Sequence, residues 1–147
     1  MSSTRKALRA DLIEALAEVV TGTALAAAPV ISAWSQSLDP ATLPVIGVTV
    51  PTEERSPAAM DADEVQITAI IVIKRIAPGD DSTDLEDALD DDAEALIGPL
   101  EAAMQGASRD FALRSSAIEI SGAGSPRIGT LTLTFSASVW RGRTLPL

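Results

Sequence analysis

The strongest constraint on the fold is a strict alternation of side-chain types within residues 127–141. Every odd position from 131 to 139 is apolar, and every even position from 130 to 138 is Ser or Thr. Successive side chains of a strand point to opposite faces of the sheet. The pattern therefore predicts a strand in a sheet with one buried face and one wet, hydroxyl-bearing face.

Two segments have the apolar periodicity of amphipathic helices. The first runs from Thr4 to about Val20, and Gly22 is a plausible stop; its stripe is Leu8, Leu12, Leu16 and Val19. The second covers residues 80–104, and its first half is crowded with acids; its stripe is Leu85, Leu89, Ala93, Leu96, Leu100 and Met104. Both helices should bury one face against the sheet.

Four further segments read as strands: residues 29–34, 43–51, 65–76 and 111–121. The segment from Ala69 to Ile73 is apolar on both faces, which predicts a central strand. The expected order is helix, three strands, helix, two strands. It predicts a single α+β domain over residues 1–147, in which two amphipathic helices cover one face of a mostly antiparallel sheet of four to five strands.

Two segments are expected to lack regular structure. Residues 51–63 are polar and contain no apolar face, so we expect a mobile loop there. Residues 144–147 should be a frayed C-terminus.

Composition excludes several kinds of chemistry. The chain has no Cys and no His, which removes the thiol nucleophile and the commonest general base and metal ligand. The acidic run fails the EF-hand pattern, because the sixth position counted from Asp80 is Leu85 instead of Gly and the twelfth is Asp91 instead of Glu. We therefore expect a protein that is not an enzyme, with no catalytic residue, no cofactor and no metal site.

Charge is unevenly distributed along the chain. The net charge is −10, yet residues 39–104 carry −13 (3 basic, 16 acidic) and residues 105–147 carry +3 (5 basic, 2 acidic). The acids indicate either a solvated helix face or a surface that meets a basic surface of the next copy. The candidate interface residues are Glu53, Glu54, Arg55, Asp80, Asp81, Asp84, Arg127, Trp140, Arg141 and Arg143. Trp34 and Trp140 are either interface anchors or residues that fill the edges of the core.

No targeting or membrane segment is expected. No apolar run reaches the roughly 18 residues that a membrane span needs. Arg5, Lys6 and Arg9 could begin a signal peptide, but acids interrupt the stretch that follows them. We expect a soluble intracellular product.

The pattern as a whole resembles a known family. The residues that carry the resemblance are the helix Ala7–Leu16, the strands Leu43–Val50 and Val65–Ile73, the acidic helix start at Asp80, Asp81, Asp84 and Leu85, and the Thr/Leu strand Leu131–Phe135. In this order they resemble the tail terminator (minor tail protein U-like) family of long-tailed bacteriophages. The resemblance covers essentially the whole chain and includes no catalytic signature.

The resemblance implies a structural virion protein. Such proteins assemble in the host cytoplasm as a homohexameric ring on the head-proximal end of the tail. The ring stops tube polymerisation and meets the tail tube protein on one side and the head connector or neck protein on the other. DNA passes through its lumen without specific binding, and no membrane is involved. The alternatives are another head–tail connector or tail-tube component of related fold, or a small acidic ligand-binding or enzymatic domain.

Overall fold

The structure is a computed structural model that describes residues 4–23, 25–26, 28–32, 44–59, 62–77, 82–106, 109–121 and 127–142. The two helices and five strands follow the order expected from the sequence. In chain order they are α1 (Thr4–Val19), β1 (Val30–Ser32), β2 (Val45–Ala59), β3 (Ala62–Ala77), α2 (Ser82–Met104), β4 (Arg109–Ser121) and β5 (Arg127–Gly142).

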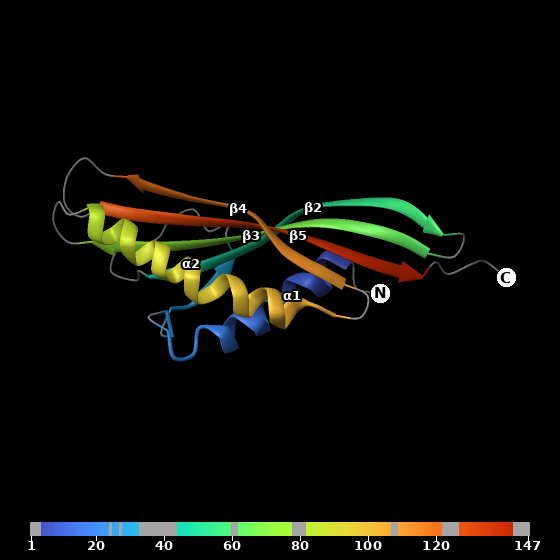
Figure 1. Cartoon of the computed structure of the whole chain (residues 1–147), viewed down its shortest axis with the longest axis horizontal. Helices are drawn as coiled ribbons and strands as arrows, with labels where there is room; N and C mark the ends of the chain where they lie inside the picture. Colours follow the sequence, from blue (N-terminus) through green and yellow to red (C-terminus); the bar gives the residue numbers. More distant parts are fainter. Residues whose placement is uncertain are drawn as a thin grey trace.

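The strands form one open sheet in the order β1-β2-β3-β5-β4 (Figure 1). Only the short β1 runs parallel to its neighbour β2; every other pair is antiparallel. The central pair β3–β5 keeps one register from Ala62–Gly142 to Ala77–Arg127. The expected α+β class, with a mostly antiparallel sheet, is confirmed.

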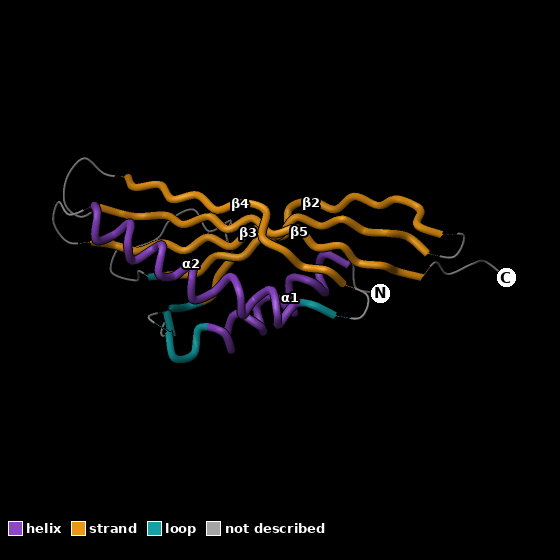
Figure 2. Tube along the Cα trace, viewed as in Figure 1, coloured by secondary structure: helices purple, strands orange, loops and turns teal. Residues whose placement is uncertain are grey.

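Both helices lie on the same side of the sheet (Figure 2). Their leucine stripes are buried in one core with the odd-numbered residues of β3 and β5, as the alternation predicts, and with Ile46, Val48 and Val50 of β2. Phe111 of β4 and Phe135 of β5 stack beneath them, with 4.7 Å between ring centroids. The core is therefore a single aliphatic layer between helices and sheet, supplied with two aromatic rings.

Gly129 of β5 allows α2 to approach the sheet closely. A Cβ atom at this position would lie 2.7 Å from Leu89 Cδ1 and 2.9 Å from Leu85 Cγ. Real side chains do not approach so closely, so any larger residue here would push α2 away from β5.

No described helix covers the opposite face of the sheet (Figure 2). The hydroxyl residues of β5 on this face are half-exposed, as are Ile70 and Val72 of the neighbouring β3. The expected division into a buried apolar face and a wet hydroxyl face therefore holds along β5.

The expectation of a loop over residues 51–63 is wrong. Most of this segment is the second half of β2 and the first residues of β3, and the two strands form a long hairpin. Arg55 lies opposite Val65, and Pro57 lies opposite Asp63. β2 gains its backbone hydrogen bonds from β3, so its outer half needs no apolar face of its own. Residues 144–147, expected to fray, lie outside the described residues.

Candidate functional site

The outer edge of β4 is the first feature of functional interest. β4 is the last strand of the sheet, and among the described residues no strand lies beside its outer edge. Near its start, the side chain of Glu101 on α2 and that of Gln105 just after α2 accept hydrogen bonds from outward backbone N–H groups. Gln105 Oε1 accepts from Phe111 N at 2.6 Å, and Glu101 Oε2 accepts from Leu113 N at 3.2 Å. These side chains occupy the position that another strand would take.

The second half of the β4 edge lacks this protection. After a bulge between Leu113 and Ser115, β4 continues in register with β5 to the pair Ser121–Ile128. Residues 115–121 contain no Pro, one charge at Glu119 and mainly small, exposed side chains. Natural edge strands are usually blunted by Pro, charge or a covering element. This part of the edge is therefore open to pairing.

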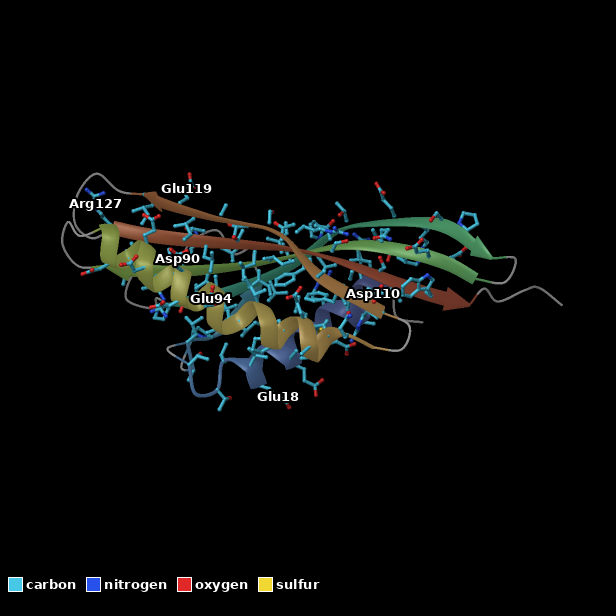
Figure 3. The ribbon with its side chains drawn as sticks, viewed as in Figure 1. Glu18, Asp90, Glu94, Asp110, Glu119 and Arg127 are labelled. Carbon is cyan, nitrogen blue, oxygen red and sulfur yellow. The ribbon has the colours of Figure 1, made fainter. Side chains whose placement is uncertain are left out.

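An acidic groove runs between α2 and this edge. We define it by Asp90, Ala93, Glu94, Ile97, Gly98 and Glu101 of α2 and Ser116 of β4. Figure 3 shows Asp90 and Glu94 on α2 below β4. α2 contains eight acids and no Lys or Arg, so no cation of its own helix offsets the groove's negative charge. The groove suits a cationic group with apolar neighbours.

One acid of α2 is not available to a partner. Asp92 is only 4% exposed and accepts two hydrogen bonds from Arg75 of β3, from Nε at 2.5 Å and from Nη2 at 2.7 Å. The hydrogen bonds to Asp92 raise the pKa of the Arg75 guanidinium above its ordinary value, although burial of Arg75 opposes the shift. The pair anchors α2 to the sheet beside the groove.

The opposite edge of the sheet has a different character. β1 spans three residues, which lie opposite Ile46, Gly47 and Val48 of β2. It therefore covers a small part of the β2 edge. Further along β2, Arg5 Nη1 donates to the carbonyl oxygen of Pro51 at 3.2 Å. Pro57 lacks an N–H group, and Glu53, Glu54 and Arg55 place charges between the two prolines. The β2 edge is therefore protected against pairing with another strand, whereas the second half of the β4 edge is not.

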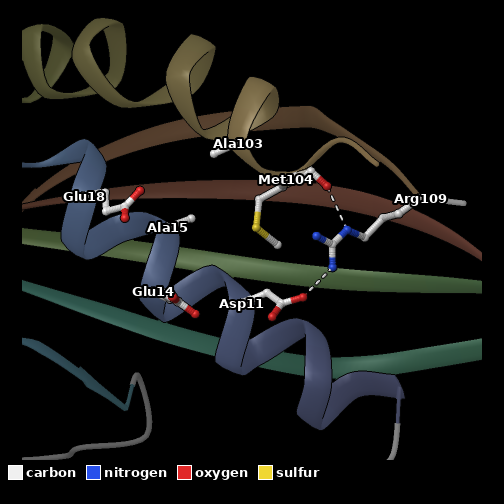
Figure 4. A pocket seen from close by; sticks show the side chains of 7 residues that line it. All are labelled: Asp11, Glu14, Ala15, Glu18, Ala103, Met104 and Arg109. Atoms are coloured by element: carbon white, nitrogen blue, oxygen red, sulfur yellow. Dashed lines mark hydrogen bonds and ion pairs between the residues drawn. The ribbon is translucent and has the colours of Figure 1, made fainter. Parts of the chain in front are cut away.

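A second groove lies where the two helices cross (Figure 4). It is lined by Asp11, Glu14, Ala15 and Glu18 of α1, by Ala103 and Met104 of α2, and by Arg109. Arg109 Nε donates to the carbonyl oxygen of Met104 at 2.7 Å, and Nη1 donates to Asp11 Oδ2 at 2.8 Å. The arginine thus ties together the end of α2, the start of β4 and α1, which is a structural role.

The structure separates the predicted interface residues into two groups. Glu53, Glu54 and Arg55 lie on the β2–β3 hairpin, at the same end of the sheet as Trp140. Trp140 is 41% exposed, and Glu64 lies opposite it on β3. Glu53 and Arg55 pair with each other at 3.2 Å.

The other group lies at the far end of the sheet. Arg127 begins β5 near the start of α2 (Figure 3), where Asp84 is exposed. Arg127 Nε is buried without a hydrogen-bond partner among the described residues. Asp80, Asp81 and Arg143 lie outside the described residues, and the backbone of Arg141 pairs with Asp63. The arginines of the C-terminal segment therefore do not form one basic patch within the described residues.

Sequence reasoning missed three features of this region: the open β4 edge, the acidic groove beside it and the pair between Arg75 and Asp92. A signal for the pair was present. Arg75 continues the buried odd positions of β3, and Asp92 falls between Leu89 and Leu96 on the apolar stripe of α2. Two charges on facing apolar surfaces require each other. The groove carried no such signal, because it depends on where α2 meets β4.

Metal-binding clusters, membrane-spanning helices and comparisons with known proteins add no further site among the described residues. Within the described ranges, no three His, Cys, Asp or Glu side chains gather as a metal ion would need. None of the described helices is both long and apolar enough to traverse a bilayer. Comparison with protein-family models and with curated proteins found no match.

Proposed function

We propose that this chain is a structural virion protein of a long-tailed bacteriophage. Six copies form a ring that caps the head-proximal end of the tail tube, stops tube polymerisation and provides the surface for head–tail joining. Its partners are further copies of itself, the tail tube protein and the head connector or neck protein. The order of helices and strands agrees with the order on which the family resemblance rests.

The observation that carries the proposal is the presence of two unlike edges on opposite sides of one open sheet. The β4 edge is open and lies beside an acidic groove, whereas the β2 edge is blunted by prolines and charged side chains. A ring uses heterologous contacts, in which one surface of each copy meets a different surface of the next. A tight two-fold dimer would instead need one self-complementary surface.

The uncovered face of the sheet supports a lumen through which DNA passes. Three successive rows across β3, β5 and β4 contain no charged residue; in β2, Gly47 and Thr49 are buried. The rows are Thr68–Ser136–Ala112, Ile70–Thr134–Ser115 and Val72–Thr132–Ala117, and Arg114 of the β4 bulge falls between the first two. Binding to DNA depends chiefly on Lys and Arg that neutralise phosphates. A lumen lined by these rows would offer DNA few contacts.

Deleting the gene from a phage that carries it tests the role. We expect tails of abnormal length together with tailless heads, and restoration of normal virions by the wild-type gene supplied in trans. Unaltered virions would refute the proposal.

The position of the protein in the virion distinguishes the proposed role from that of a tube component. Gold-labelled protein should mark one end of the tube in electron micrographs. Label along the whole tube would identify a tube component instead.

A further inference from the structure

We propose that the acidic groove and the open β4 edge bind residues 141–147 of a second copy of this chain as an added strand. The inference rests on the proposed function, because it names the contact that would join neighbouring copies of the ring. It is carried by the backbone of the edge, by the charge of the groove and by the length of β5.

The backbone of β4 sets where a strand can be added. Phe111 and Leu113 turn their N–H groups outward to Gln105 and Glu101, and an added strand cannot extend past these side chains. Beyond the bulge, residues 115, 117, 119 and 121 lie opposite Thr134, Thr132, Thr130 and Ile128 of β5. Alternate residues of a strand direct their N–H and C=O groups to opposite sides, so Ser116, Ile118 and Ile120 present theirs outward. An added strand is thereby confined to residues 115–121.

The groove selects the side chains of that strand. Its acids are Asp90, Glu94 and Glu101, and Ile97 and Ala93 lie between them. Residues 141–147 read Arg-Gly-Arg-Thr-Leu-Pro-Leu, so an extended conformation places Arg141, Arg143 and Leu145 on one side. Alternate side chains of a strand are about 6.6 Å apart along its axis. Residues four apart on a helix, such as Asp90 and Glu94, are about 6 Å apart. Two cations and one apolar side chain thus match two acids followed by an apolar patch.

The arginines cannot come from the same chain. Ser115 lies opposite Thr134, and Gly142 is the eighth residue after Thr134 in β5. That distance is about 26 Å at the rise of a strand. Arg143 follows Gly142 directly and extends the chain by less than about 4 Å. Figure 1 shows the end of β5 and the end of β4 on opposite sides of the molecule. A second copy must therefore supply the strand.

A charge exchange in the full-length chain tests the contact. We would compare three variants with wild type. The first combines Asp90→Lys and Glu94→Lys, the second combines Arg141→Glu and Arg143→Glu, and the third carries all four substitutions. Sedimentation velocity would measure self-association, and circular dichroism would confirm that each variant is folded. Each double variant should associate about tenfold or more weakly than wild type, because like charges then face each other. The combined variant should recover most of the wild-type association.

Two further variants make the result specific. Asp87→Lys with Asp91→Lys adds the same charge at the same helical spacing outside the groove, and it should leave association unchanged. Ile118→Pro removes one outward N–H group and should weaken association without preventing folding, because Pro is tolerated at the solvent side of an edge strand.

The outcomes separate this inference from the proposed function. If wild type forms rings and the groove variants form them equally well, the inference is wrong and the ring uses another contact. A folded combined variant that fails to recover association also overturns it. If wild type does not associate at any concentration or on tails, both the inference and the proposed function fail.

Discussion

The guanidinium of Arg75 on β3 and the carboxylate of Asp92 on α2 meet through two hydrogen bonds, at 2.5 and 2.7 Å, beneath the acidic face of the helix. Arg75 lies opposite Gly129 of β5, the residue whose missing side chain lets α2 approach the sheet. The ion pair from β3 and the absence of a side chain at Gly129 on the adjacent β5 thus act on the same helix. Together they set the height of α2 above β5, and with it the groove between α2 and β4.

Replacing Asp92 should destabilise the fold. Asp92→Asn leaves Arg75, whose side chain is 17% exposed, without a counter-charge. We expect the free energy of unfolding to fall by about 1–3 kcal/mol, as for a lost hydrogen bond to a charged group. Asp91→Asn is the matched control, because Asp91 is the next residue along α2 and its side chain is exposed. This substitution should change the free energy of unfolding by less than about 0.5 kcal/mol. Urea denaturation followed by circular dichroism measures both; equal values would remove the pair from the stability of the fold.

The Arg75–Asp92 ion pair should still stabilise the fold at alkaline pH. The pKa of Arg75 is raised by Asp92, so the stability that arginine protonation contributes is complete below the ordinary arginine pKa. It is lost only when the pH rises through the higher folded value. The difference in unfolding free energy between wild type and Asp92→Asn should therefore be the same at pH 7 and pH 10. A difference that shrinks toward pH 10 would contradict the assignment of the charge to Arg75.

Two glycine substitutions should differ in their effect on stability. Gly129→Ala forces a Cβ against Leu85 and Leu89 and should cost about 1–3 kcal/mol through overpacking. Gly98→Ala on exposed α2 meets nothing within 4 Å. Gly98 precedes Pro99, whose ring disfavours the helical conformation of a preceding residue that carries a Cβ. This cost offsets the usual gain from Gly to Ala in a helix, so the free energy of unfolding should change by less than about 0.5 kcal/mol. Thermal unfolding of the two variants side by side is the measurement, and a stabilising Gly129→Ala would show that α2 can move outward at no cost.

Removing the side chains that protect β4 should expose part of its edge. In a Glu101→Ala, Gln105→Ala double variant, the outward N–H groups of Phe111 and Leu113 lose their acceptors. Their amide hydrogens should exchange faster by about tenfold or more, measured by nuclear magnetic resonance. Ala112, which lies opposite Ser136 in the β4–β5 pair, serves as an internal control and should keep its protection. Equal acceleration at all three amides would indicate that β4 itself has loosened.

Arg109 should matter more than the aspartate with which it pairs. Asp11 is 51% exposed, so its ion pair with Arg109 is worth about 0.2–1 kcal/mol and weakens in salt. Arg109→Ala also loses the bond to the Met104 carbonyl oxygen at the end of α2, and its cost should exceed that of Asp11→Ala. A double-mutant cycle at low and high ionic strength separates the two contributions. If the two single variants cost the same, the carbonyl contact contributes nothing.

Local periodicity was sufficient to predict the order and type of the elements. The alternation along β5 and the leucine stripes of α1 and α2 each depend on residues close in sequence, and each marks the face that a strand or helix must bury. Those patterns correctly indicated one helical layer on one face of the sheet. The buried positions Leu133, Phe135 and Ala137 lie on the face that the sequence assigns to the core.

Tertiary structure decided what local patterns could not encode. Residues 51–59 are a strand because β3 supplies hydrogen-bond partners, although the segment has no apolar face of its own. The sequence places Asp92 on the buried stripe of α2 and Arg75 among the buried positions of β3, but only the packing of α2 on the sheet brings the two side chains together. The open edge of β4 and its groove arise only where α2 crosses the end of the sheet. Short-range periodicity determines which face a residue prefers, whereas pairing between distant segments determines which charges are neutralised and which backbone groups remain available.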